Sequence, residues 1–389
     1  MKINNNEIKS HKIFAMFVFL YCLCIVYVIP VSSNLNLDSS IHGDIYSIMR
    51  LGIVIPTLVS FVIIPKKPVS NIIEYISLLT LLISSWIIKG EFQGTSLFVL
   101  ISIVLLDTLN KIHITLDKTL KCLVHIITIC FVCQLMVMST YFYTQNGFWG
   151  IIGSFKDANY TSYFLILLYF LNGDEKVTNI IQKRDILLFL SILTYSRTAL
   201  IVVGLIVLIR LLHIGKKIRL KHIYLTYFMF FTIWMIICNL YIKYFNGFNY
   251  IYEYRTGFDR FSNIVDESNY IRTLVNVQVL EYTSLKSFFL GFSNFEYNSL
   301  INFNDKMIYP HNLFLSIFSK SGFFFSIALV KRLCSIFANN KFDNLAFFIA
   351  IVLFSNILGP SFYYGIDLII ILYAVRFQKE DQGEQNGKN

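Results

Sequence analysis

Charged residues are scarce in this sequence. Asp, Glu, Lys and Arg together make up only 14% of the 389 residues, whereas they supply roughly a quarter of an average soluble domain. Apolar residues account for 56% and aromatic residues for 16% of the chain, and the mean hydropathy is +0.62. So little charge cannot cover the surface of a soluble protein of this length, and the composition therefore excludes a water-soluble globular domain.

Two signatures of secreted proteins are also missing. The seven cysteines all fall in predicted helices or cytoplasmic loops, so no disulfide framework is indicated. Cys130 and Cys133 are spaced like a redox or zinc pair, but they lie inside an apolar run without a second pair, and ordinary packing explains them better. The first apolar run, at residues 13–31, follows several lysines, but no clear small-residue cleavage site follows it. We therefore predict an uncleaved first helix.

Long apolar stretches recur from Ile13 to Val375, and one bilayer crossing needs about 20 residues of helix. We predict an all-α, polytopic transmembrane protein with about twelve spans, in which residues 1–389 form a single integral membrane domain. The predicted spans are 13–31, 45–64, 72–88, 95–109, 122–143, 160–172, 186–195, 198–212, 223–242, 311–330, 344–358 and 364–375. The sixth to eighth are short for a bilayer, which indicates tilted helices or half-helices beside a cavity.

The formal net charge is +10, and the positions of the cations decide its meaning. Cytoplasmic loops of membrane proteins are enriched in Lys and Arg. With both termini in the cytoplasm, the following cations fall in cytoplasmic turns: Lys66, Lys67, Lys111, Lys118, Lys121, Lys176, Lys183, Arg184, Lys216, Lys217, Arg219, Lys221, Lys331, Arg332 and Lys341. The charge therefore indicates membrane orientation, and we predict no nucleic-acid partner.

One sizeable segment, residues 243–310, lies outside the predicted spans. It falls on the outer side between the ninth and tenth spans and is much longer than an ordinary turn, and loops of such length are usually functional. Within it, residues 269–286 are predicted to form a helix, with Ser268 or Asn269 as the cap and Gly291 soon after the end. At the other end of the chain, residues 378–389 are polar and are predicted to form a disordered cytoplasmic tail.

Three side chains on the predicted outer side could carry chemistry. Arg197 lies at the junction of two spans, where an interfacial anchor is an equally good interpretation. Arg272 lies in the first turn of the predicted loop helix, where amides and a guanidinium could hold phosphate oxygens, although a solvated charge also explains it. His311 follows Pro310 at the start of a span, where the helix dipole favours a neutral imidazole, although an interfacial side chain is the simpler interpretation.

These residues belong to a longer series of motifs. GSFKDANYTSYF, TYSRTAL, a large loop with Arg272 ahead of FFLGF, and HNLFLSIFSKSG follow one another in this order. The series resembles the O-antigen polymerase and ligase family, which contains Wzy-type polysaccharide polymerases and WaaL-type ligases, over roughly residues 150–330. The resemblance implies a GT-C-like helical fold in the bacterial inner (plasma) membrane. It also implies metal-independent glycosyl transfer from an undecaprenyl-diphosphate-linked oligosaccharide on the outer side of that membrane.

The resemblance also assigns roles to individual residues. Arg197 matches the arginine of a Ser-Arg motif, Arg272 matches the large-loop arginine, and His311 with Asn312 matches a His-Asn motif. Asn159 matches a further position of the family, and Arg260 of the large loop is an additional candidate for substrate binding. Gly153 matches a family glycine, whereas Ala158, Ser293, Lys320 and Phe325 depart from the usual proline, glycine, acidic residue and glycine.

The implied reaction needs positive charge and a base. The departing diphosphate is stabilised by preorganised cations, which we assign to Arg197 and Arg272. The acceptor hydroxyl needs a base during its attack on the anomeric carbon, which we assign to His311. No Asp-x-Asp sequence occurs in a predicted outer segment, so we predict neither a metal nor another cofactor.

Three functions stay open at this point. We favour a polymerase, because such enzymes vary greatly in sequence, over a ligase that transfers the glycan to lipid A core or protein with the same residues. A polysaccharide flippase or secondary transporter is the third, because Lys320 and Asp367 are ionisable residues within predicted spans. The expected partners are the lipid-linked oligosaccharide, membrane lipids and, for a polymerase, a chain-length regulator.

Overall fold

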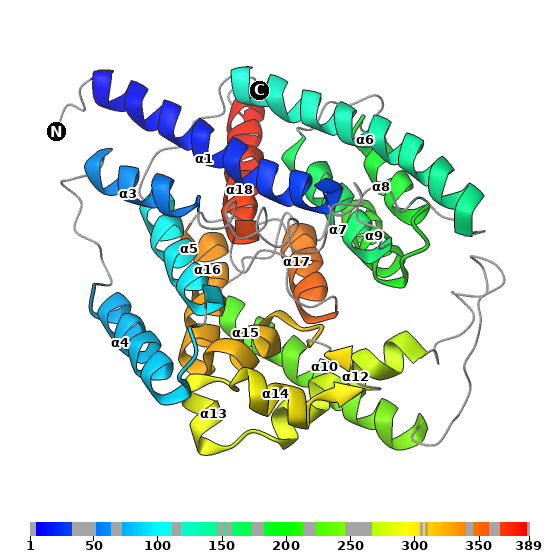
Figure 1. Cartoon of the computed structure of the whole chain (residues 1–389). Helices are drawn as coiled ribbons and strands as arrows, with labels where there is room; N and C mark the ends of the chain where they lie inside the picture. Colours follow the sequence, from blue (N-terminus) through cyan, green and yellow to red (C-terminus); the bar gives the residue numbers. More distant parts are fainter. Residues whose placement is uncertain are drawn as a thin grey trace.

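The protein, seen here in a computed structural model, folds almost entirely into α-helices (Figure 1). The structure describes residues 5–32, 52–63, 72–92, 94–110, 118–146, 151, 158–172, 183–212, 222–245, 267–303, 306–307, 310–339, 345–357 and 366–386. Arg260 and Gly153, both named by the sequence analysis, lie outside these residues.

The helices are α1 (Asn5–Ser32), α3 (Val54–Ile63), α4 (Ile72–Lys89), α5 (Gly94–Asn110), α6 (Lys118–Asn146), α7 (Ala158–Leu171), α8 (Asp185–Ile192), α9 (Arg197–Leu211), α10 (Ile223–Phe245), α12 (Glu267–Glu281), α13 (Leu285–Leu290), α14 (Asn294–Leu300), α15 (Leu313–Ser321), α16 (Phe323–Asn339), α17 (Leu345–Ile357) and α18 (Ile366–Asn386). A short antiparallel pair, β1 (Asn302–Phe303) and β2 (Lys306–Met307), holds the only strands among the described residues. A helix lies at every predicted span, which confirms the all-α prediction. The twelve crossings and the GT-C-like arrangement stay predictions.

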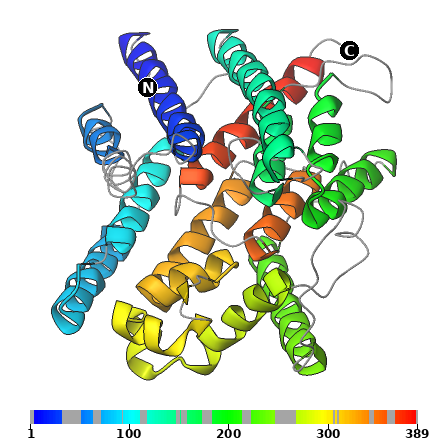
Figure 2. The same cartoon turned by 45° about the vertical axis from the view of Figure 1, so that its right-hand side comes forward.

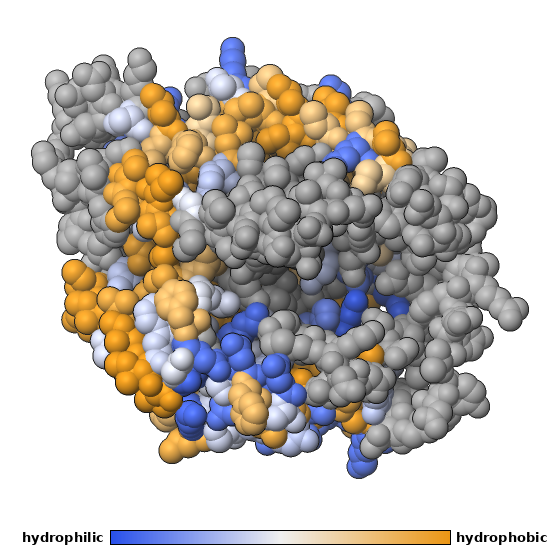
Figure 3. All heavy atoms as spheres, viewed as in Figure 1, coloured by the Kyte–Doolittle hydropathy of each residue, from blue (hydrophilic) through white to orange (hydrophobic). Residues whose placement is uncertain are grey.

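Three helices in the described part of the chain are long and apolar enough to cross a membrane: α4, residues 118–138 of α6, and residues 223–244 of α10. Shorter apolar helices occur at residues 10–23, 94–110, 158–171 and 345–357. The exposed side of α4 carries Ile72, Ile73, Ile76, Ile83 and Ile87, and apolar atoms cover the surface over α4 and α6 in Figure 3. Apolar side chains with no protein partner suit a lipid environment, so this is a membrane-embedded protein.

The first and last helices pack together. Helix α1 lies against α18, which also contacts α5, α7 and α16 near the centre of the molecule. In Figures 1 and 2, α1 and α18 lie at the upper end and α12 to α14 lie at the lower end. The predicted topology likewise separates the termini from the large loop, although the orientation in a membrane stays a prediction.

The prediction of one continuous tenth span over residues 311–330 is wrong. Helix α15 ends at Ser321 and α16 begins at Phe323, with Gly322 between them at φ 80°. A Cβ atom at Gly322 would lie 2.2 Å from the carbonyl oxygen of Phe289. The chain bends here because the backbone of α13 approaches so closely that only glycine fits.

Lys331 and Arg332 lie within α16 and not in a turn, and Lys118 and Lys121 likewise lie within α6. The cytoplasmic side expected for these residues stays a prediction. Arg332 is only 4% exposed, and its guanidinium lies 2.9 Å from Asp107 Oδ1 and 2.9 Å from Glu74 Oε2. Lys331 Nζ lies 2.8 Å from the same Glu74 oxygen. Partnered in this way, a buried arginine is tolerated inside the bundle, and the ion pairs join α4, α5 and α16.

Two further differences concern helix ends. The helix predicted over residues 269–286 is divided into α12 and α13, because Ser284 begins a new helix through a capping box with Ser287. Helix α18 continues to Asn386, through most of the 378–389 segment that was predicted to be disordered. The polar residues that follow Arg376 include Gln, Lys and Glu, which are good helix formers.

Candidate functional site

Arg197 is the first residue of α9, and the residue before it fixes the start of that helix. The Ser196 hydroxyl accepts a hydrogen bond from the Ala199 amide at 3.2 Å and donates one to Asn159 Oδ1 at 2.7 Å. Ser196 is 1% and Asn159 6% exposed. The cap therefore ties the start of α9 to the start of α7, and Arg197 is held half-buried beside this junction.

The turn that leads into α9 has a constrained backbone. Tyr195 has φ 55°, in the left-handed region that costs a non-glycine residue about 1–2 kcal/mol. Its amide donates to the Ile192 carbonyl at 3.0 Å, and the Thr194 hydroxyl donates to the Ser191 carbonyl at 2.7 Å. Strained residues of this kind concentrate at functional sites, and this one lies two residues before Arg197, in the turn between α8 and α9.

His311 lies next to a second buried cap. Asn312 begins α15, its Oδ1 accepting from the Leu315 amide at 3.0 Å. Its Nδ2 donates to Asn356 Oδ1 at 3.0 Å and to the Asn356 carbonyl at 3.2 Å. Asn312 is fully buried, so its amide fixes the start of α15 against the end of α17, and the substrate contact expected of it stays a prediction.

The structure places His311 just before α15, one residue ahead of its cap, and not within the first turn as the sequence analysis expected. The side chain is half-buried. Asparagine is among the best N-cap residues, which explains why the helix begins after Asn312. The amides at the start of α15 are nevertheless close in sequence, so the positive end of its dipole still lies beside His311.

Arg272 is also displaced from its predicted position. Helix α12 begins at Glu267, two residues earlier than expected, and Arg272 therefore lies in the second turn with a half-buried side chain. At this point backbone amides are bonded within the helix, so they would not add to a contact between the guanidinium and an anion. Helix α12 packs on α10 and on α15, the helix that follows His311.

The helices that carry the predicted residues form one packed series. Helix α17 contacts both α9 and α15, and α12 contacts α15. Direct hydrogen bonds join Asn159 to Ser196 and Asn312 to Asn356. Arg197, Arg272 and His311 each have a half-buried side chain, and the helices that carry or follow them belong to this packed series.

Sequence reasoning missed three residues that shape this region: Tyr195, Ser196 as a cap, and Asn356. Asn356 is a buried amide near the end of the apolar helix α17. An isolated amide in such a helix needs a polar partner, so its position could have suggested a contact with another helix. The left-handed conformation of Tyr195 left no signal in the sequence.

The large loop supplies the polar surface near this series. Hydrophilic residues gather over α13 and α14 on the face shown in Figure 3. In α14, the backbone amide of Ser293 donates to the Glu296 carboxylate at 2.9 Å, and Lys286 lies 3.4 Å from it. The Ser293 amide, with the nearby Lys286 charge, lowers the pKa of Glu296 below its usual value.

Within the described residues, no three His, Cys, Asp or Glu side chains lie together as a metal site would require. Comparisons with protein-family models, curated proteins and solved structures gave no match. The family assignment therefore stays at the level of the resemblance carried by the motifs.

Proposed function

We propose that this protein is a polysaccharide polymerase that joins undecaprenyl-diphosphate-linked oligosaccharide repeat units at the outer surface of the bacterial inner membrane. The observation that carries the proposal is the pair of buried caps, Ser196 and Asn312. Each adjoins a predicted catalytic residue, and each is hydrogen-bonded to a different helix. Such support is what preorganised catalytic groups require.

In this proposal, an acceptor hydroxyl attacks the anomeric carbon of the donor sugar. A new glycosidic C–O bond forms, and the bond between the anomeric carbon and the diphosphate oxygen breaks. His311 takes the proton of the attacking hydroxyl. Arg197 and Arg272 stabilise the negative charge that develops on the departing lipid diphosphate.

The test compares variants of the proposed residues in a strain whose polymer ladder depends on this protein. Arg197→Ala, Arg272→Ala and His311→Ala should each remove long-chain polymer while the protein level in the membrane is unchanged. Removal of a general base costs about a hundredfold to ten-thousandfold in rate. Arg272→Lys should also be impaired, because an ammonium cannot form a bidentate contact with a diphosphate.

His222→Ala provides a matched control, because His222 is an exposed histidine before α10, outside the proposed site. It should leave the ladder intact. Normal ladders from all four site variants would refute the assignment. Transfer of the finished glycan to lipid A core or protein, without lengthening of the repeat, would identify the ligase in place of the polymerase.

A transporter is a second candidate, because the tenth span is discontinuous. Lys320 lies in the last turn of α15 directly before the break, and Asp367 is buried at the start of α18, where Tyr163 bonds to it. Broken helices and buried ionisable residues are common at transporter sites. Reconstituted vesicles separate the functions, since a transporter moves the lipid-linked oligosaccharide across the bilayer without lengthening it.

A further inference from the structure

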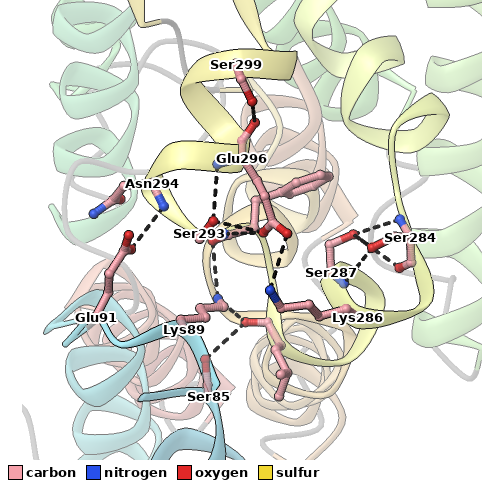
Figure 4. Close-up of polar contacts among 12 residues, drawn as sticks. Ser85, Lys89, Glu91, Ser284, Lys286, Ser287, Ser293, Asn294, Glu296 and Ser299 are labelled. Atoms are coloured by element: carbon pink, nitrogen blue, oxygen red, sulfur yellow. Dashed lines mark hydrogen bonds and ion pairs between the residues drawn. The ribbon is translucent and has the colours of Figure 1, made fainter. Parts of the chain in front are cut away.

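Lys89 joins two chain segments that are distant in sequence, α4 and the large loop. It is the last residue of α4, and Figure 4 shows its ammonium directed at the backbone of the large loop. Its Nζ donates to the carbonyl oxygen of Leu290 at 2.5 Å and to that of Phe292 at 3.2 Å. The Ser85 hydroxyl, one turn earlier in α4, adds a contact of 3.4 Å to the Leu290 carbonyl.

The carbonyl of Leu290 is at the carboxyl end of α13, where the last carbonyls of a helix have no intrahelical donor and the dipole favours a cation. An interfacial anchor would extend toward lipid headgroups or water. Lys89 is instead half-buried, and it bonds two carbonyls on either side of Gly291. Its contacts therefore indicate that it holds the loop in place.

The loop segment held by Lys89 lies directly on the break in the tenth span. A Cβ atom at Gly291 would lie 2.5 Å from the carbonyl carbon of Lys320, and one at Gly322 would lie 2.2 Å from the carbonyl oxygen of Phe289. The Phe292 amide donates to the Ser319 carbonyl at 2.7 Å. The two backbones thus pack against each other with no side chain between them.

The segment that follows is fixed to the residues just after α4. The Asn294 amide donates to Glu91 Oε2 at 3.0 Å, and Ser293 begins α14 through a capping box with Glu296 (Figure 4). The end of α4 therefore holds the loop on both sides of Gly291. Only residues 282–284 separate α13 from α12, the helix that carries Arg272.

We propose that Lys89 is a positioning residue for the glycosyl transfer proposed above, and the inference rests on that function. It docks α13 on the break between α15 and α16. Docking fixes the relative positions of α12, which carries Arg272, and of α15, which begins next to His311. Lys89 acts through the loop and does not touch the substrate.

The first arm of the test measures docking without reference to activity. Leu290 is 8% exposed, so a Leu290→Cys reporter in the purified protein should react slowly with an alkylating reagent. Mass spectrometry gives the rate as the labelled fraction of the peptide that contains position 290. Lys89→Met should raise the rate at position 290 at least tenfold, whereas Lys89→Arg, which keeps a cationic donor, should not.

Lys286→Met is the matched control. Lys286 belongs to the same loop segment, but its side chain is 46% exposed and contacts Glu296 across 3.4 Å, so its loss should leave alkylation unchanged. Equal alkylation of the parent and of Lys89→Met would overturn the docking role.

The second arm measures polymerisation by the same variants with a diphosphate-linked donor. Lys89→Met should lower kcat at least tenfold, and Lys89→Arg should restore it, while Lys286→Met stays at the parental value. Faster alkylation with unchanged kcat would overturn the positioning role and leave the proposed function intact. If the parent protein does not polymerise the donor at all, the proposed function is refuted, and the positioning role of Lys89 is refuted as well. The alkylation arm still reports whether Lys89 docks the loop.

Discussion

Substitution of Gly322 by alanine tests the contact between the large loop and the broken tenth span. Two costs follow from the structure. The backbone of Gly322, at φ 80° and ψ 178°, is in a region that is essentially restricted to glycine and costs another residue about 1–3 kcal/mol. The added Cβ would also lie 2.2 Å from the Phe289 oxygen and 2.6 Å from its carbonyl carbon. These are backbone atoms and cannot rotate away, so overpacking adds about 1–3 kcal/mol.

Two other glycines separate these costs. Gly90 also has a positive φ, 65°, but nothing lies within 4 Å of its added Cβ, so Gly90→Ala should lose only the conformational part, about 1–2 kcal/mol. Gly204 lies within α9, and its Cβ would also meet nothing within 4 Å. Gly204→Ala should therefore gain up to about 1 kcal/mol from helix propensity. The total for Gly322→Ala is about 2–6 kcal/mol.

The assay is thermal unfolding of the purified protein in detergent. One kcal/mol shifts Tm by about 2–4 °C in domains of 150–250 residues and by less in a longer chain, so the order of the variants is the measured outcome. We expect Gly204→Ala to be the most stable, Gly90→Ala the next and Gly322→Ala the least. A Gly322→Ala variant as stable as Gly90→Ala would show that α13 does not lie against the break.

Two further predictions concern charged residues. Arg332→Met should destabilise the protein by about 3–5 kcal/mol, because it leaves Asp107 buried beside an apolar side chain. Lys331→Met, at a side chain that is 46% exposed, should cost less than about 1 kcal/mol. Equal losses of Tm in the two variants would contradict the buried network. Glu296 has a lowered pKa in the folded state, so its carboxylate stabilises the fold at pH values above its unfolded pKa and loses this effect as pH falls through the folded value. The Tm of Glu296→Gln should therefore lie below that of the parent at pH 7 and approach it in acid, and a constant difference would refute the role of the charge.

The sequence predicted where helices form because a membrane helix is encoded locally. A long run of apolar residues has no water-soluble alternative, and its backbone must be hydrogen-bonded internally. The break at Gly322 was not predictable from such a run. It depends on the backbone of α13, which approaches from another part of the chain, and a glycine in an apolar stretch is equally compatible with a continuous helix. Arg332 was misplaced for the same reason, since its partners Glu74 and Asp107 come from α4 and α5.

For the candidate site, the sequence allowed only the residue types and their order along the chain to be predicted. Ser196 and Asn312 are residues that commonly cap helices, so the starts of α9 and α15 were within reach of the sequence. Their partners Asn159 and Asn356 were not, because the pairing of two buried amides or hydroxyls depends on which helices become neighbours. The resemblance predicts a substrate contact for Asn312, whereas the bonds of its amide to Leu315 and Asn356 become visible only in the structure.

The loop backbone that lies against the break between α15 and α16 bears on the choice between a polymerase and a transporter. In a transporter, the ends of a broken helix face the substrate near the middle of the membrane. Here the carbonyl of Ser319, close to the end of α15, accepts the amide of Phe292, and the space beside Gly322 is filled by the backbone at Phe289. The broken helix therefore receives a segment of the large loop. A break used in this way joins the membrane helices to a loop that carries Arg272, which favours chemistry at the membrane surface over passage through the bilayer.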